Sequence, residues 1–370
     1  MNNKIKTLVI LVIVLIASLG VSWLLFVQNK EQAQIIESKK EANNKTEQVA
    51  QPTLLSEYIN EKVFQPNNLV WQNITTEADW ERRDAHTAVV FKDRMWVLGG
   101  VGGDYPTYNE TKNDVWASND GANWELIKDN APWRARRGHT SVVFQDKIWI
   151  MGGATGEEIF LNDVWASTNG IEWERITRDA GWTPRKGFSA VVFENKIWIM
   201  GGASTRGVKN DIWYSEDGKN WNLAIENAAW SNRYDIEIEV FNNKLWLSGG
   251  IYTDGRWTGK RDVWVSKNGT AWELVSKQAP WLGRHGHCFI AFKDHLWIIG
   301  GWSGYGKGYN DTWFSKDGIT WEKFLSDGPW KRREDRACLV FQNQMFLMGG
   351  MPMDGIREND VWRLDNADMP

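Results

Sequence analysis

Three carboxylate side chains alternate along one short segment, and their types and spacing come closest to those of a catalytic group. Asp235, Glu237 and Glu239 are separated by single isoleucines in the sequence YDIEIEV. In a β-strand, residues two apart point to the same side. Buried carboxylates this close raise one another's pKa unless a base pairs with them, and acid–base catalysis or a cation can use such a group. The alternative is pairing with neighbouring bases, for which the candidates are Arg185, Lys186 and His285.

A second set of charged residues recurs along the chain and combines arginine with aspartate. A guanidinium group matches carboxylates, phosphates and sulfates, so the arginines could form an anion-binding site. Equal numbers of the two residue types also favour ion pairs within the framework. The arginines are Arg83, Arg136, Arg185, Arg233, Arg284 and Arg333, and the aspartates are Asp114, Asp163, Asp211, Asp262, Asp311 and Asp360.

Aromatic residues in glycine-rich loops form a third candidate set. Aromatic side chains on the loops of a rigid scaffold are typical of recognition surfaces, where they stack on sugar rings or peptide side chains. Together with the six arginines, the predicted ligand-binding residues are Tyr105, Trp257, Trp302 and Tyr305. The same loops carry Tyr108, Tyr252 and Tyr309.

The elements that must position these residues are short strands in six repeat units. Each unit reads WxxR, an apolar run ending in Phe, a polar turn, a run like IWIMGG, a glycine-rich loop, NDVW and SxDGxxW. Short runs rich in Val, Ile, Phe and Trp between Gly, Asp and Asn predict four strands per unit. The double glycines that mark the repeat begin at Gly99, Gly152, Gly201, Gly249, Gly300 and Gly349, with spacings of 53, 49, 48, 51 and 49 residues. We number the units one to six by their WxxR motifs, which begin at Trp80, Trp133, Trp182, Trp230, Trp281 and Trp330.

Tryptophan columns test this register, because most of the 26 tryptophans fall at four equivalent positions in the units. Unit six ends at Pro370, shortly after its third-strand Trp362, and so lacks a fourth strand. The segment 69–79 resembles the fourth strand of the other units and contains Trp71. We therefore predict that this first strand pairs into the last unit and closes the ring, which removes the exposed sheet edges.

The double glycine after the second strand, the Trp near the fourth and the period of about 50 residues resemble kelch repeats. The resemblance covers 69–364 and implies an all-β, six-bladed kelch-type β-propeller, with the arginines near the mouth of its central channel. The turn SNDGANW at 118–124 is also similar to the Asp-box of sialidases, although it is one residue shorter. Asp-Gly between strands favours a tight hairpin, so we interpret this turn as structural.

The N-terminal segment predicts a membrane anchor. Residues 7–27 form an uncharged run of 21 residues, which is long enough to cross a bilayer. No AxA-like cleavage site follows, so we expect an uncleaved signal anchor, and Lys4 and Lys6 favour a cytoplasmic N-terminus. The predicted order is a short tail (1–6), a transmembrane helix (7–27), a polar stalk (28–66) and a propeller (67–370) in the periplasm or outside the cell.

Composition and the remaining motifs exclude several classes. A net charge of −4 argues against a nucleic-acid-binding protein. The two cysteines, Cys288 and Cys338, are non-equivalent in successive units, so we expect buried free thiols, with a disulfide as the alternative. His86, His139 and His287 share one position in three units, which indicates a framework role. We expect no metal and no cofactor.

Two functions remain, and they belong to different classes. The preferred one is a binding or scaffold module, anchored in the membrane through 7–27, for a protein segment or a glycan. The alternative is a carbohydrate-active enzyme (mutarotase, epimerase or hydrolase) that uses the carboxylates of unit four; the resemblance allows this, because kelch-like propellers include a sialic-acid mutarotase and galactose oxidase. No catalytic Ser-His-Asp order, phosphate-binding glycine loop or metalloprotease helix indicates another activity.

Overall fold

The computed structural model describes residues 66–103, 110–253, 257–304 and 306–366. Its contacts divide the chain into Met1–Gln65 and Pro66–Pro370, and all the described residues belong to the second unit. The predicted transmembrane helix (7–27) and almost all of the predicted stalk (28–66) lie outside the described residues. Among those that are described, no helix has the length and apolar character needed to cross a membrane.

Units one to five each form a four-stranded antiparallel sheet with the strands in sequence order. Unit one supplies β2 (Thr87–Phe91), β3 (Arg94–Gly102), β4 (Glu110–Ser118) and β5 (Glu125–Lys128). Unit two supplies β6 (Thr140–Phe144), β7 (Lys147–Ala154), β8 (Phe160–Ser167) and β9 (Glu174–Thr177). Unit three supplies β11 (Ser189–Phe193), β12 (Lys196–Met200), β15 (Ile212–Ser215) and β16 (Asn222–Ile225). Units four and five supply β17 (Glu237–Phe241), β18 (Lys244–Ser248), β21 (Val263–Ser266) and β22 (Trp272–Ser276), then β23 (Cys288–Phe292), β24 (His295–Trp302), β25 (Gly308–Ser315) and β26 (Glu322–Leu325).

The last sheet joins the two ends of the described chain. It contains β1 (Leu69–Thr75), β27 (Arg333–Glu334), β28 (Ala337–Phe341), β29 (Gln344–Pro352) and β30 (Glu358–Asn366), and the 3₁₀ helix η1 (Pro66–Asn68) precedes β1. Two small sheets lie in the loops: β10 (Arg185–Lys186) with β13 (Ala203–Ser204) and β14 (Gly207–Val208), and β19 (Ile251–Thr253) with β20 (Trp257–Gly259).

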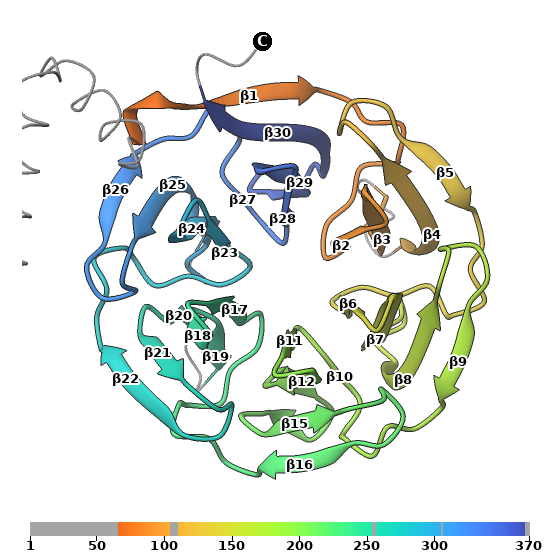
Figure 1. The fold of residues 1–370 in the computed structure, drawn as a ribbon. Coiled ribbons are helices and arrows are strands. Elements are labelled where there is room, and N and C mark those ends of the chain that lie inside the picture. Colours follow the sequence, from red (N-terminus) through yellow and green to blue (C-terminus); the bar gives the residue numbers. More distant parts are fainter. Residues whose placement is uncertain (1–65, 104–109, 254–256, 305, 367–370) are drawn as a thin grey trace, which may run out of the picture. The chain divides into compact units, whose positions relative to one another are not determined.

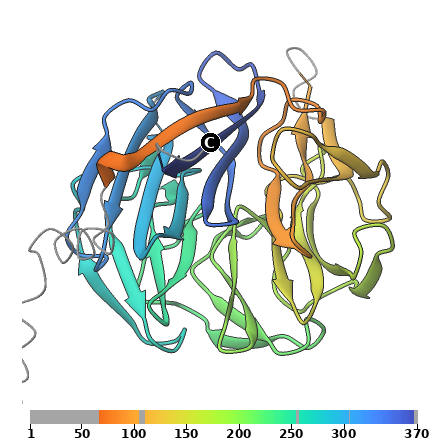
Figure 2. The ribbon, with the colours of Figure 1, turned by 45° about the horizontal axis from the view of Figure 1, so that its top comes forward.

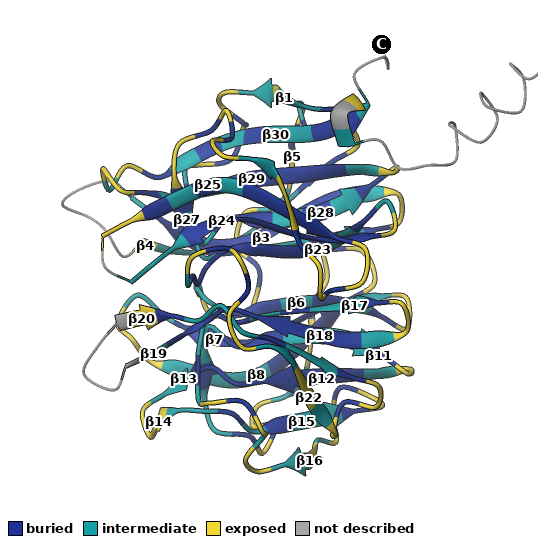
Figure 3. Cartoon of the chain, turned by 90° about the vertical axis from the view of Figure 1, so that its left-hand side faces the viewer, coloured by how far each residue is buried: buried dark blue, intermediate teal, exposed yellow. Residues whose placement is uncertain are grey.

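The sheets are arranged around a central axis, with the strands β2, β6, β11, β17, β23 and β28 innermost (Figure 1). Each inner strand lies beside the inner strands of the two neighbouring sheets, and β28 lies beside β2. Buried residues lie mostly in the inner strands and in the strands next to them, whereas exposed residues lie mostly in the connecting turns (Figure 3). The all-β architecture of small antiparallel sheets built from kelch repeats is therefore confirmed.

The predicted pairing of the first strand with the last unit is also confirmed. β1 pairs antiparallel with β30 (Figure 2). In this pairing, Trp71 lies opposite Leu364. The ring of Trp71 packs edge-on against that of Trp330, with 4.7 Å between centroids. Asn359 Nδ2 donates to the Ala78 carbonyl at 2.9 Å, just as Asn113 Nδ2 donates to the Ala131 carbonyl at 2.8 Å between units one and two. Unit six therefore joins unit one as the other units join one another.

Tryptophan accounts for much of the core between the strands. In unit two, Trp133 of the WxxR motif is 1% exposed and packs edge-on against Trp173 of the fourth segment at 5.9 Å. The second-strand Trp96 donates its Nε1–H to the Phe91 carbonyl at 2.8 Å and lies against Gly170, in the Asn-Gly turn of the next unit. A side chain at that turn glycine would overlap the indole ring. The turn glycines therefore serve packing, in agreement with their structural interpretation.

Two neighbouring side chains leave no space for a Cβ atom at either residue of the double glycine. At Gly152, a Cβ atom would lie 2.8 Å from Phe188 of the next unit, and at Gly153 it would lie 2.8 Å from the Cβ of His139 in the same unit. Both glycines have positive φ, +57° and +93°, which β-carbon-bearing residues rarely adopt. The repeat therefore keeps both glycines for close packing, independently of any ligand.

Candidate functional site

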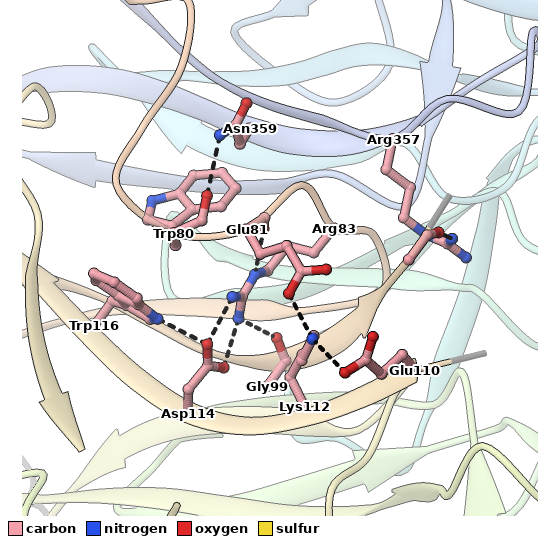
Figure 4. Close-up of polar contacts among 11 residues, drawn as sticks. Trp80, Glu81, Arg83, Gly99, Glu110, Lys112, Asp114, Trp116, Arg357 and Asn359 are labelled. Carbon is pink, nitrogen blue, oxygen red and sulfur yellow. Dashed lines mark hydrogen bonds and ion pairs between the residues drawn. The ribbon is translucent and has the colours of Figure 1, made fainter. Parts of the chain in front are cut away.

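The six arginines of the WxxR motifs are paired within the fold. Figure 4 shows Arg83, whose Nη1 and Nη2 each lie 2.7 Å from one carboxylate oxygen of Asp114. Nη1 also donates to the Gly99 carbonyl at 2.9 Å, and Nε donates to the Glu81 carbonyl at 3.0 Å. Trp116 Nε1 donates to the same carboxylate at 2.8 Å. The two-pronged contact with aspartate recurs for Arg136–Asp163, Arg185–Asp211, Arg233–Asp262, Arg284–Asp311 and Arg333–Asp360. At Arg333, the Nε group has no hydrogen-bond partner among the described residues.

These pairs leave little of the arginines accessible to a ligand. All six side chains are at most 1% exposed, and each makes a two-pronged contact with its aspartate. Burial acts to raise the pKa of Asp114, but the hydrogen bonds and charge of Arg83 outweigh it and lower that pKa. The geometry supports the framework interpretation, so the proposals below do not place an anion on these arginines.

A belt of backbone hydrogen bonds lies next to these pairs and runs between the units. The second residue after each motif arginine has a positive φ. In units one to four and in unit six, its N–H donates to the corresponding carbonyl of the preceding unit, as from Gly138 to Ala85 at 2.9 Å. This position is glycine in units two, three and five, but aspartate at Asp235 (φ +48°) and Asp335 (φ +53°). Aspartate is tolerated there at some cost, so both carboxylates are departures from what the framework needs.

Asp235 and Asp335 belong to a group of side chains that we call the mouth cluster, namely Asp235, His285, Glu334 and Asp335. His285 Nδ1 lies 3.5 Å from a carboxylate oxygen of Asp235 and 3.5 Å from one of Glu334. Burial acts to lower the pKa of His285, but the two carboxylates outweigh it and raise that pKa. Burial and the charges of Glu334 and Asp235 raise the pKa of Asp335 well above its ordinary value. The mouth cluster therefore gathers three carboxyl groups around one histidine.

Glu237 and Glu239 lie two and four residues after Asp235, in β17, and neither has a base as its partner among the described residues. The candidate bases are used elsewhere: Arg185 pairs with Asp211, Lys186 with Glu158, and His285 with Asp235. Burial, with the charges of Asp235 and Glu239, raises the pKa of Glu237 to about 8, and burial raises that of Glu239 to about 8. Pairing with a base, the alternative considered from the sequence, therefore holds for Asp235 and does not hold for Glu237 or Glu239.

A cavity of about 320 Å³ lies among the inner strands, and both glutamates line it. Its lining includes residues from all six units, among them His86, Ser141, Phe188, His287 and Arg336. Within the described part of the chain, no three His, Cys, Asp or Glu side chains are grouped so that they could hold a metal ion.

The expectation of two free thiols is wrong, because Cys288 and Cys338 form a disulfide. Their positions in the repeat are not equivalent, but β23 and β28 are neighbouring inner strands and bring the Cα atoms to 6.1 Å, a normal separation for a disulfide. The disulfide joins units five and six beside the cavity, which Cys338 lines.

Most of the predicted loop aromatics lie where the structure gives no side-chain description. Tyr105 and Tyr305 are outside the described residues, and so is the side chain of Trp257. Trp302 is half-buried, and its backbone pairs with that of His285 through hydrogen bonds of 2.9 and 3.0 Å. Trp302 therefore lies next to the mouth cluster.

Sequence reasoning missed His285, Glu334, Asp335 and Arg336 as parts of one site. The available signal was the identity of the second residue after the motif arginine. Asp235 and Asp335 occupy this position, where three other units have glycine. A systematic comparison of that position across the units would have identified both aspartates.

Replacing the two cavity glutamates with the residues of other units should stabilise the protein at alkaline pH. Above about pH 4.5, their ordinary pKa, the unfolded chain loses these protons, whereas the folded chain keeps them until about pH 8. The unfolded state then binds fewer protons, so stability falls as the pH rises through this window. We expect Glu237→Thr/Glu239→Val to be more stable than the wild type by about 2 kcal/mol or more at pH 8, since one pK unit corresponds to about 1.4 kcal/mol and solvent in the cavity screens part of the shift.

Urea unfolding at pH 4.5 and pH 8, followed by tryptophan fluorescence, measures this difference. The gap between variant and wild type should widen with pH. An equal gap at both values would show that the glutamates do not hold their protons in the folded protein.

Comparison with known proteins places the chain in a family. The model of the KLHDC2/KLHL20/DRC7 Kelch-repeats domain matches residues 57–202 and, in a second overlapping match, 101–267. Together these matches span more than half of the chain, which belongs to the kelch-repeat family. Among solved structures, the chain is similar to that of YjhT, with a TM-score of 0.64 and 15% identity over 78% of this chain and 96% of that one. At this identity the likeness shows the fold alone. No curated protein matches the chain.

Proposed function

We propose that this protein is a membrane-anchored, extracytoplasmic binding module in which a six-bladed kelch-type propeller holds a protein segment or a glycan at the mouth of its central channel. The observation that carries the proposal is the mouth cluster. Asp235 and Asp335 stand where units two, three and five have glycine, and both have a positive φ, so their side chains meet no need of the framework.

The location rests on two separate observations. The uncharged run 7–27 has the length of a membrane span. The disulfide between Cys288 and Cys338 suits an oxidising compartment, because the cytosol keeps thiols reduced. Both support a propeller outside the cytoplasm.

Aromatic side chains are the second means of binding that we assign to the mouth. Trp302 is backbone-paired with His285, and we assign ligand contact to it and to the loop residues Tyr105, Trp257 and Tyr305. An aromatic ring stacks equally well on a sugar face or on a peptide side chain, whereas the carboxylates of the cluster favour ligands that donate hydrogen bonds or carry positive charge.

Glycan and peptide arrays probed with the full-length chain in nanodiscs test the proposal. The decisive variant is Asp235→Gly/Asp335→Gly, which restores the glycine of units two, three and five and so removes the carboxylates without disturbing the backbone. We expect selective binding to at least one ligand class, a loss of more than tenfold in the glycine variant, and no loss of thermal stability. Trp302→Ala should weaken the same binding.

Binding that survives both variants would contradict a ligand at the mouth, and no selective binding to either array would contradict the binding role. The enzyme alternative is favoured only by the unpaired carboxyls of Glu237 and Glu239. Analysis of the mass and the anomeric form of the recovered ligand distinguishes an enzyme from a binding module, because a binding module returns its ligand unchanged.

A further inference from the structure

The central cavity lies beyond the mouth cluster along the inner strands and has the properties of a small-molecule site. Its volume of about 320 Å³ falls at the lower end of the range for such sites, roughly 300–1,000 Å³. Residues from all six units line it. The glutamates that depart from the repeat, Glu237 and Glu239, lie on one side of one strand and both face this space.

Several buried polar groups around the cavity lack partners among the described residues. His287 is 2% exposed and His86 is 5% exposed, and both ring nitrogens of each are without a hydrogen bond. The Ser141 hydroxyl and the Nε and Nη1 groups of Arg336 are also unsatisfied. Buried polar groups in folded proteins are nearly always hydrogen-bonded, because leaving one unpaired costs about 1–3 kcal/mol. The cavity thus offers both donors and acceptors to a molecule that occupies it.

Most of the ionisable side chains on the cavity wall are uncharged at neutral pH. Burial raises the pKa of Glu237 and of Glu239 to about 8, so both keep their protons. Burial and the charge of a neighbouring arginine lower the pKa of His86 to about 3, which leaves that ring neutral. Arg336, whose pKa burial and the charge of a second arginine lower only to about 9, remains charged and repels cations. A wall made mostly of neutral donors and acceptors favours a neutral ligand.

We propose that the cavity binds a neutral polyhydroxylated molecule of monosaccharide size, whose hydroxyl groups hydrogen-bond to Glu237, Glu239 and His287. Hydroxyl groups both donate and accept, so they satisfy the mixed set of unpaired groups. Phe188 and Phe289 also line the cavity and offer apolar surface to the carbon-bound hydrogens of such a ligand. The site adjoins the proposed mouth site, because Asp235 and Asp335 also line the cavity. It is assigned to other side chains, however, and its ligand class does not follow from that proposal.

Titration calorimetry of the full-length chain in nanodiscs with glucose, galactose, mannose and N-acetylglucosamine tests the inference. Cadaverine and gluconate serve as a cationic and an anionic probe of similar size. We expect at least one neutral sugar to bind and neither ion to compete with it. The variant Glu237→Thr/Glu239→Val, which carries the residues of other units, should lower the affinity for the sugar by more than tenfold. The variant Glu237→Gln/Glu239→Gln keeps neutral hydrogen-bonding groups and should change that affinity less than threefold.

The pH dependence gives a second readout. Affinity should be level from pH 6 to 7 and fall as the pH rises through about 8, where the two carboxyls lose the protons that they donate. The inference is overturned if cadaverine binds more tightly than every sugar and the Gln variant abolishes its binding, or if no sugar binds. The mouth variant Asp235→Gly/Asp335→Gly keeps Glu237 and Glu239, so it distinguishes the two proposals. If this variant loses binding to the arrays while the wild type binds no sugar, the present inference is overturned and the proposed function stands.

Discussion

Replacing Asp163 with alanine will destabilise the protein by about 3–5 kcal/mol, because it leaves a fully buried arginine without its counter-charge. Arg136 is 0% exposed, and both of its terminal nitrogens contact Asp163, at 2.8 and 2.9 Å. After the substitution the Gly152 carbonyl would be the only remaining acceptor of Nη1, and Trp165 Nε1 would lose its acceptor as well. Chemical unfolding followed by tryptophan fluorescence measures the loss.

The matched control is Glu174→Ala, on an exposed carboxylate of the same unit. This substitution should change stability by less than about 0.5 kcal/mol, as surface replacements usually do. A loss of under 1 kcal/mol for Asp163→Ala would contradict the role assigned to the six pairs, since it would mean that water or another group readily replaces the aspartate.

Deleting the strand β1 (Leu69–Thr75) from the full-length chain will open the ring and cause self-association. The deletion leaves β30 with an unpaired edge and removes Trp71 from Trp330, whose ring lies 4.7 Å away. Removing a fully buried aromatic side chain costs about 3–5 kcal/mol, and Trp71 is half-buried, so the loss of its packing costs less than that. Exposed sheet edges recruit strands from other chains. Thermal unfolding and light scattering should show a lower melting temperature and particles larger than the wild type.

A synthetic peptide with the β1 sequence LVWQNIT provides the control for this deletion. Added in trans, it should occupy the free edge by strand addition and restore both the melting temperature and the particle size, whereas a scrambled peptide should not. An unchanged melting temperature and size in the deleted chain would show that β1 does not close the ring.

The repeat explains why the framework could be predicted from the sequence. The missing fourth-strand tryptophan of unit six and the presence of Trp71 ahead of unit one predict the pairing of β1 with β30, and the structure confirms it. Local turn chemistry gives the hairpins in the same way: at Asp120 and Gly121, the carboxylate accepts the backbone N–H of Asn123 at 2.9 Å and the glycine has a φ of +82°.

The site was harder to predict, because its contacts join residues far apart in the sequence. Cys288 and Cys338 lie at different repeat positions, and only the packing of β23 against β28 brings them together. His285 is one of three candidate bases for the carboxylates of unit four, and the sequence does not indicate which base pairs with which carboxylate; in the structure it lies beside Asp235. Arg185 pairs with Asp211 and Lys186 pairs with Glu158. Neither base is therefore available as a counter-charge for Glu237, and the sequence alone does not show this.

The most direct test of the account is an experimental structure of the full-length chain with a ligand obtained from the arrays or the sugar panel. The account predicts ligand density on the central channel, within hydrogen-bond distance of Asp235 or Asp335 at the mouth or of Glu237 or Glu239 in the cavity. Ligand density confined to the outer strands, with the channel filled only by water, would contradict it.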